Sequence, residues 1–127
     1  PEDFDLNRIF GAFLPWQHVV ENKSYGNNYD YHRAILMMEK KDFLENGFFV
    51  TQEHHAWHAP VSILYYQRYT NLTDVEHEIK SHLEQLQCIA TNTSLSLDTV
   101  ALGETQKPGL SDYADHVDTI AFLASLG

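Results

Sequence analysis

Three neighbouring segments constrain the fold of this 127-residue chain more than any other feature. Residues 47–51 and 59–66 are short apolar runs rich in aromatic and β-branched side chains, and residues 72–79 carry apolar residues at helical spacing. Such runs predict two strands followed by an amphipathic helix. Because a strand that leads into a covering helix is typical of layered proteins, we expect an α/β fold with a partly parallel sheet.

The rest of the chain continues this alternation of helices and strands. Helical spacing of apolar residues predicts helices over residues 3–14, 31–45, 74–85 and 117–126. Pro15 is expected to end the first helix, Asn46 and Gly47 to end the second, and Thr73 with Asp74 to cap the third.

Polar segments between these elements are predicted as connections: residues 21–28, 52–58, 91–98 and 103–109, of which the first and the last contain glycine. A further strand is predicted over residues 99–102. Since no interdomain linker interrupts the chain, residues 1–127 are predicted to form a single layered helix/sheet domain.

The charge of the chain excludes some classes of partner. Eighteen acidic and eight basic residues give a net charge of −10, which repels nucleic acid and anionic lipid. No apolar run approaches the roughly 20 residues of a membrane span, and no basic-then-apolar secretion signal is present. We therefore predict no nucleic-acid partner, no membrane span and a cytoplasmic location.

Cys88 is the single cysteine of the chain, which excludes an intramolecular disulfide. Residues 86–90 are predicted to form a short buried strand. A buried free cysteine commonly acts as a small hydrophobic side chain, whereas a nucleophilic thiol needs a nearby base, cation or helix N-terminus. Cys88 is therefore interpreted as structural.

Three histidines in one short connection, His54, His55 and His58, suggest a different chemistry. Imidazole is a common zinc ligand, but a structural zinc site normally has four ligands and this set is incomplete. Pro60 also disfavours the helix that would place His54 and His58 on one face. Solvated or packing histidines are favoured, and a small acidic metal- or ligand-binding module that uses this loop remains the alternative.

Tyrosine and asparagine residues gather between positions 25 and 31. Tyr25, Tyr29 and Tyr31 alternate with polar residues that include Asn28. Such side chains can orient a ligand by hydrogen bonds, and Asn28 and Tyr31 are the candidate substrate or cofactor contacts. A loop whose aromatic rings anchor it to the core is the favoured interpretation.

Several segments in a fixed order resemble one enzyme family. They comprise residues 26–31, the strand 47–51, the Ala-Pro-Val turn 59–61 with the strand and helix after it, residues 87–89, 103–108 and 111–119. Together they resemble the bacterial acyl-CoA reductases of the aldehyde dehydrogenase superfamily, related to the fatty acid reductase of bioluminescent bacteria. The resemblance covers most of the chain and implies part of an aldehyde-dehydrogenase-like catalytic domain.

The resemblance implies that this chain is the C-terminal part of a longer enzyme. Such an enzyme reduces an acyl-CoA thioester to an aldehyde through a cysteine acyl-enzyme, with NADPH or NADH as reductant. In the family, the nucleophilic cysteine and the nucleotide-binding region lie upstream of the matched segments. The chain is thus expected to hold no catalytic residue, to bind no cofactor alone and to be catalytically incomplete; homo-oligomerisation is left open.

The chain departs from the family pattern before the Pro-Val turn. Many aldehyde dehydrogenases have a glutamate and an aromatic residue there, which contact the nicotinamide ribose and ring. This sequence has Ala56 and His58 at the matching places. It therefore lacks the carboxylate, and His58 is the third candidate contact to substrate or cofactor.

Overall fold

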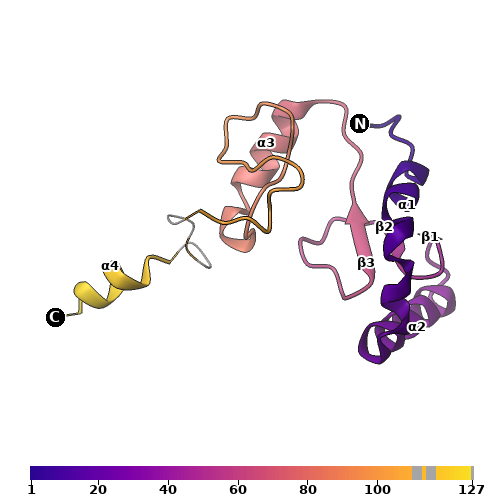
Figure 1. Ribbon diagram of the computed structural model, residues 1–127. Helices are drawn as coiled ribbons and strands as arrows, with labels where there is room; N and C mark the ends of the chain where they lie inside the picture. Colours follow the sequence, from indigo (N-terminus) through magenta and orange to yellow (C-terminus); the bar gives the residue numbers. More distant parts are fainter. Residues whose placement is uncertain (110–112, 114–116, 127) are drawn as a thin grey trace. The chain divides into compact units, whose positions relative to one another are not determined.

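The structure, a computed structural model, describes residues 1–109, 113 and 117–126 (Figure 1). The chain divides into two compact units, Pro1–Thr70 and Asn71–Gly127. Helices and a mixed three-stranded sheet together confirm the general α/β class. The single domain expected over residues 1–127 stays a prediction.

The sheet lies in the first unit and has the strand order β1-β2-β3. Strand β1 (Leu44–Glu45) pairs antiparallel with β2 (Val50–Glu53), and β2 pairs in parallel with β3 (Ile63–Tyr66). The partly parallel sheet is therefore confirmed, although both predicted strands begin later than expected. Figure 1 shows the loop that connects β2 to β3, and no helix lies within it.

Pro15 does not end the helical path at the start of the chain. Helix α1 (Asn7–Phe13) is followed directly by the 3₁₀ helix η1 (Leu14–Glu21), which has this proline in its first turn. A proline is tolerated there because the N–H groups of a first turn have no partner within the helix. The predicted stop is replaced by a change of helix type.

The loop predicted over residues 21–28 is wrong, because helix α2 (Lys23–Met38) occupies most of it. Asn22 caps this helix: its Oδ1 accepts hydrogen bonds from the N–H groups of Ser24 at 3.0 Å and Tyr25 at 3.2 Å. Gly26 lies within the helix where η1 approaches closely: a Cβ at this position would lie 2.6 Å from the backbone oxygen of Val20.

The helix predicted to reach residue 45 ends at Met38 instead. Lys40 follows in a left-handed conformation with φ of 54°, which ends the helix without a glycine. Leu44 and Glu45 then form β1, the edge strand next to β2. The chain turns between β1 and β2 at Gly47, whose φ is 91°.

The hydrophobic core of this unit is small. Tyr29 and Leu36 of α2 pack with Val50 of β2, which is fully buried. Partly buried apolar side chains surround them: Val20, Tyr25, Phe43 and Ile63. The core therefore fastens α2 to the central strand and holds η1 and β3 in place around it.

The second unit contains α3 (Leu72–Lys80), the 3₁₀ helix η2 (Leu83–Gln85) and α4 (Thr119–Ala124). Asn71 caps α3 by accepting the N–H of Thr73 at 3.0 Å, so the predicted cap by Thr73 and Asp74 is wrong. None of the described residues of this unit is buried. The described residues of this unit therefore form no buried hydrophobic core.

Two predictions about this unit need correction. The strands expected over residues 86–90 and 99–102 are reduced to one isolated parallel bridge between Ala90 and Val100. The helix expected over residues 117–126 begins at Thr119, where the side chain of Asp118 accepts the N–H of Ala121 at 2.9 Å. Residues 111, 112 and 114–116 of the family-like segment 111–119 lie outside the described residues.

Candidate functional site

An apolar pocket in the first unit is the candidate site, and we call it the aromatic pocket. Its lining comprises Phe13, Trp16, Val19, Tyr25, Phe48, Phe49, Ser62, Ile63 and Leu64. Its volume is about 370 Å³, within the range of about 300–1,000 Å³ found for small-molecule sites. Trp16 is 63% exposed, so the pocket opens to solvent on the side of η1.

Ring contacts fix the walls of the aromatic pocket. The ring of Phe49 lies 5.2 Å from that of Phe10, 5.6 Å from that of Phe13 and 5.1 Å from that of Phe48, measured between centroids. The turn before β2 holds Phe48 and Phe49 in place, because Oδ1 of Asn46 accepts both of their N–H groups. Phe49 thus joins α1 to the sheet and forms a rigid wall.

Ser62, in the wall of the pocket, has a positive φ and a buried hydroxyl without a hydrogen bond. It is the third residue of a turn closed by the Ile63 N–H, which donates to the Pro60 oxygen at 3.1 Å. Its φ is 73°, a left-handed value that a residue with a Cβ rarely adopts. Ser62 is 9% exposed, and its Oγ has no hydrogen-bond partner. Strained residues and unsatisfied buried groups are concentrated at functional sites.

We expect Ser62→Gly to stabilise the first unit by about 0.5–1 kcal/mol, because glycine adopts a positive φ without the Cβ clash and lacks the unpaired hydroxyl. Urea unfolding followed by tryptophan fluorescence measures this, since both tryptophans, Trp16 and Trp57, lie in the unit. Ser62→Ala keeps the Cβ and should gain less. A less stable Ser62→Gly variant would contradict the strain argument.

The aromatic pocket is electrically neutral. None of the described residues that line it carries a formal charge at pH 7. Burial raises the pKa of Tyr25, so its hydroxyl keeps its proton at neutral pH. The pocket can therefore receive apolar groups, but it offers nothing to neutralise a phosphate or carboxylate.

A polar cluster of Tyr29, Arg33 and Glu45 lies beside the core and connects α2 to β1. The Tyr29 hydroxyl donates to Oε2 of Glu45 at 2.6 Å, and Nε of Arg33 donates to the same oxygen at 2.6 Å. The hydrogen bond from Arg33 lowers the pKa of the Glu45 carboxyl. Burial, reinforced by the bond to Glu45, raises the pKa of Tyr29 to about 12. The cluster holds two elements that support the site.

The raised pKa of Tyr29 predicts a loss of stability in alkali. The unfolded state releases this proton near the ordinary pKa of 10.0, whereas the folded state keeps it up to about pH 12. Since the folded state binds more protons between these values, the free energy of unfolding falls as pH rises through the window. Tyr29→Phe should show a smaller fall, and parallel pH curves for the two proteins would contradict the assignment.

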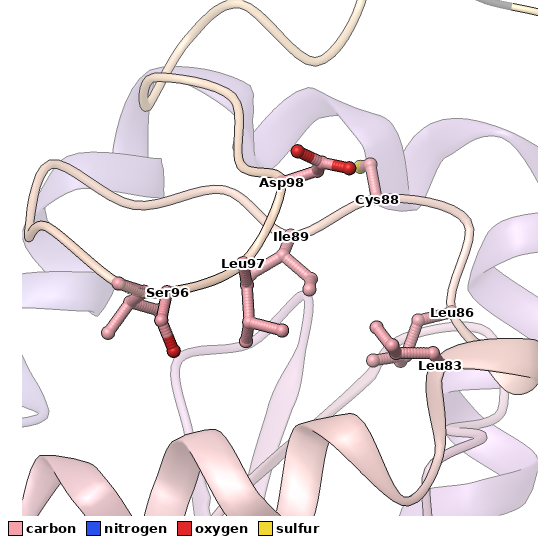
Figure 2. Close-up of a pocket in the computed structure, with 8 residues that line it drawn as sticks. Leu83, Leu86, Cys88, Ile89, Ser96, Leu97 and Asp98 are labelled. Carbon is pink, nitrogen blue, oxygen red and sulfur yellow. The ribbon is translucent and has the colours of Figure 1, made fainter.

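A second cavity, of about 660 Å³, lies in the second unit (Figure 2). Its apolar lining comes from Leu83, Leu86, Ile89, Leu95 and Leu97, and its polar lining from Ser96, Cys88 and Asp98. The prediction that Cys88 is buried in a strand is wrong: Cys88 is exposed, because residues 86–90 do not join a sheet. The described lining supplies no cation or imidazole that would activate a thiol.

Glu76 of α3 holds the loop beside this second cavity. Its carboxylate accepts the N–H of Ser96 at 3.0 Å and the Ser96 hydroxyl at 2.6 Å, and Nζ of Lys80 donates to the same hydroxyl at 2.9 Å. The hydrogen bonds from Ser96 lower the pKa of Glu76. Glu76 therefore acts as an anchor for the loop.

The three residues predicted to contact substrate or cofactor are not brought together, and none lines either cavity. Nδ2 of Asn28 donates to the Ser24 oxygen within α2 at 2.8 Å. Tyr31 is 61% exposed and its ring contacts that of His32. His58 is exposed on the loop between β2 and β3. Their assignment stays a prediction.

In the histidine loop, His54 stacks on Tyr65 with ring centroids 4.4 Å apart, and its Nδ1 accepts the N–H of Ala56 at 2.9 Å. His55 and His58 are exposed. Over the part of the chain that the structure describes, no three His, Cys, Asp or Glu side chains are grouped so that they could hold a metal ion. The metal- or ligand-binding alternative stays a prediction.

Sequence reasoning did not identify the residues of the aromatic pocket as one site. The lining comes from three separate segments, residues 13–25, 48–49 and 62–64, and only the fold brings these segments together. The one local signal was the Pro60-Val61-Ser62 turn, in which a residue other than glycine occupies the position that needs a positive φ.

Comparisons with known proteins add no relative. The chain matches no protein-family model, no curated protein and no solved structure. Among the described residues, no helix is both long and apolar enough to cross a membrane. The resemblance to acyl-CoA reductases therefore depends on the ordered sequence segments.

Proposed function

We propose that this chain is the C-terminal part of a cytoplasmic, NAD(P)H-dependent acyl-CoA reductase with an aldehyde-dehydrogenase-like catalytic domain. The parent enzyme would convert an acyl thioester into an aldehyde through a cysteine acyl-enzyme. Attack by a thiolate, stabilisation of the oxyanion and hydride delivery are the steps that such a reaction needs. This chain would supply a wall of the acyl site.

One observation carries the proposal: two segments that resemble the family converge on the aromatic pocket. Phe48 and Phe49 come from the family-like segment 47–51, Ser62 comes from the turn that contains Pro60 and Val61, and Ile63 and Leu64 come from the strand after it. The pocket that they form with η1 is apolar, uncharged and of small-molecule size. A hydrocarbon chain is the group that such a lining receives most favourably, because its transfer from water is driven by the hydrophobic effect.

The linings of the two cavities do not fit the nucleotide parts of the substrates. Coenzyme A and NADP carry several phosphates, which usually meet Arg, Lys or helix N-termini. Neither cavity has a Lys or Arg in its described lining, and Asp98 in the second cavity would repel an anion. The proposal therefore places the nucleotide contacts and the nucleophile in upstream parts of the parent enzyme.

The complete product of the gene that encodes this sequence should oxidise NADPH or NADH when a long-chain acyl-CoA is added, with formation of the aldehyde. Absorbance of the reduced nicotinamide and chromatography of the product measure the two sides of the reaction. Replacement of Cys88 by alanine is the matched control and should leave the rate unchanged, because this cysteine lies outside the proposed reaction.

Two results would contradict the proposal. One is a complete product that forms no aldehyde from any acyl-CoA, and the other is loss of the reaction in the Cys88→Ala variant. The second result would place the chemistry in the second cavity, which the proposal excludes.

A further inference from the structure

We propose that the aromatic pocket binds a straight acyl chain ending in a neutral carbonyl, with the Ser62 hydroxyl as its hydrogen-bond donor, and that it discriminates against fatty acid carboxylates. This inference rests on the proposed function and adds to it the chemical state of the group that the pocket recognises. A fatty aldehyde, the product of the reduction, is the occupant to which we commit.

The first step of the argument is the unused hydroxyl. Ser62 is more than nine-tenths buried, it lines the pocket, and its Oγ has no partner among the described residues. A buried hydroxyl without a hydrogen bond costs free energy that a bonded ligand would return. Oγ exposes less than 1 Å² in this rotamer, so a change of χ1 must first turn it into the pocket before it can donate to an acceptor on a ligand.

The second step concerns the shape and chemistry of the rest of the wall. Aromatic and aliphatic side chains form all of the remaining lining except for the hydroxyl of Tyr25 and the indole N–H of Trp16. A ligand that uses this wall is apolar over most of its length, and its polar atoms gather at one end. A straight hydrocarbon chain with one carbonyl oxygen meets this description.

The third step is charge. The described lining holds no cation, and the chain has a net charge of −10. Transfer of a carboxylate into such a pocket costs its hydration without an ion pair in return, whereas a carbonyl loses far less. The pocket should therefore separate a neutral aldehyde from the corresponding fatty acid.

Ligand titrations of the 127-residue chain test this inference. In a Trp57→Phe background, Trp16 is the only tryptophan and lies in the pocket wall. The probes are methyl undecyl ketone, which is an unreactive carbonyl compound, sodium dodecanoate and dodecane. We expect the ketone to shift the Trp16 emission to shorter wavelength and to bind at least about tenfold more tightly than dodecanoate at pH 7, because the anion is desolvated without a partner.

Substitution of Ser62 separates its hydroxyl from its backbone. Ser62→Ala should weaken ketone binding about fivefold, the value of one neutral hydrogen bond, and should leave dodecane binding unchanged. Thr51→Val is the matched control: Oγ1 of Thr51 is also buried without a partner, but Thr51 does not line the pocket. Ketone binding should be the same in this variant as in the parent chain.

Three outcomes would overturn the inference: no change in Trp16 emission with any probe, dodecanoate binding as tight as ketone binding, or equal ketone affinity in the parent and in a folded Ser62→Ala variant. Circular dichroism establishes folding of the variants. If the complete gene product shows reductase activity and any of these three outcomes is observed, this inference fails and the proposed function stands. Selective ketone binding without reductase activity would overturn the proposed function and keep the site.

Discussion

Replacing Phe49 by alanine should destabilise the first unit by about 3–5 kcal/mol, the cost typical of removing a buried phenylalanine ring. Phe49 is 8% exposed, and its ring contacts Phe10 and Phe13 of α1 as well as Phe48. Its removal leaves a cavity between α1 and the turn before β2, and it also opens the aromatic pocket. Urea unfolding followed by tryptophan fluorescence, which reports on this unit, gives the change in the midpoint.

The control for this prediction is Phe13→Ala in the same pocket. Phe13 is 49% exposed, so less apolar area is returned to water and we expect a loss of about 1 kcal/mol. Equal losses in the two variants would show that Phe49 is no more buried in solution than Phe13. That result would contradict the arrangement of the pocket wall.

Glu45→Ala should cost about 2–3 kcal/mol, because it removes the acceptor shared by two donors. The Tyr29 hydroxyl, on a buried side chain, would be left without its hydrogen bond, which accounts for most of the loss. The pairing with Arg33 adds little, because the Arg33 side chain is 41% exposed and solvent weakens an exposed ion pair. The same unfolding experiment measures the effect.

Two further substitutions identify the source of that loss. Glu45→Gln keeps an oxygen that can accept the Tyr29 hydroxyl, so it should recover more than half of the stability lost in Glu45→Ala. Glu39→Ala removes an exposed carboxylate just after α2 and should change stability by less than about 0.5 kcal/mol. If Glu45→Gln and Glu45→Ala were equally unstable, the charge of Glu45 and not its hydrogen bond with Tyr29 would hold α2 to β1.

The elements that could be predicted from the sequence are those with a strong local pattern. The predicted strands 47–51 and 59–66 overlap β2 and β3, which pair in parallel. The segment after Asn71 forms α3. The polar character of residues 21–28 and the presence of Gly26 predict a loop, which is wrong. A cap from Asn22 and the close approach of η1 at Gly26 made the same residues helical. Close packing against another element leaves no local trace in the sequence.

The candidate site was harder to predict than the fold. Residue type points to Asn28 and Tyr31, but a helix turns the Asn28 amide back to its own backbone and leaves Tyr31 exposed. Cys88 was expected to be buried because its neighbours are apolar, yet burial needs a sheet that this segment does not join. Ser62 gained its significance from a backbone angle and a missing partner, and neither can be predicted from residue type.

The most direct test of the reductase proposal is the mass of the acyl-enzyme. The complete gene product is incubated with a long-chain acyl-CoA without NADPH or NADH, and its intact mass and its peptides are measured. The account predicts a protein longer than these 127 residues, which gains one acyl group on a cysteine upstream of Pro1 and loses it when NADPH or NADH is added. A product that gains no acyl group, or gains it on Cys88, would contradict the account.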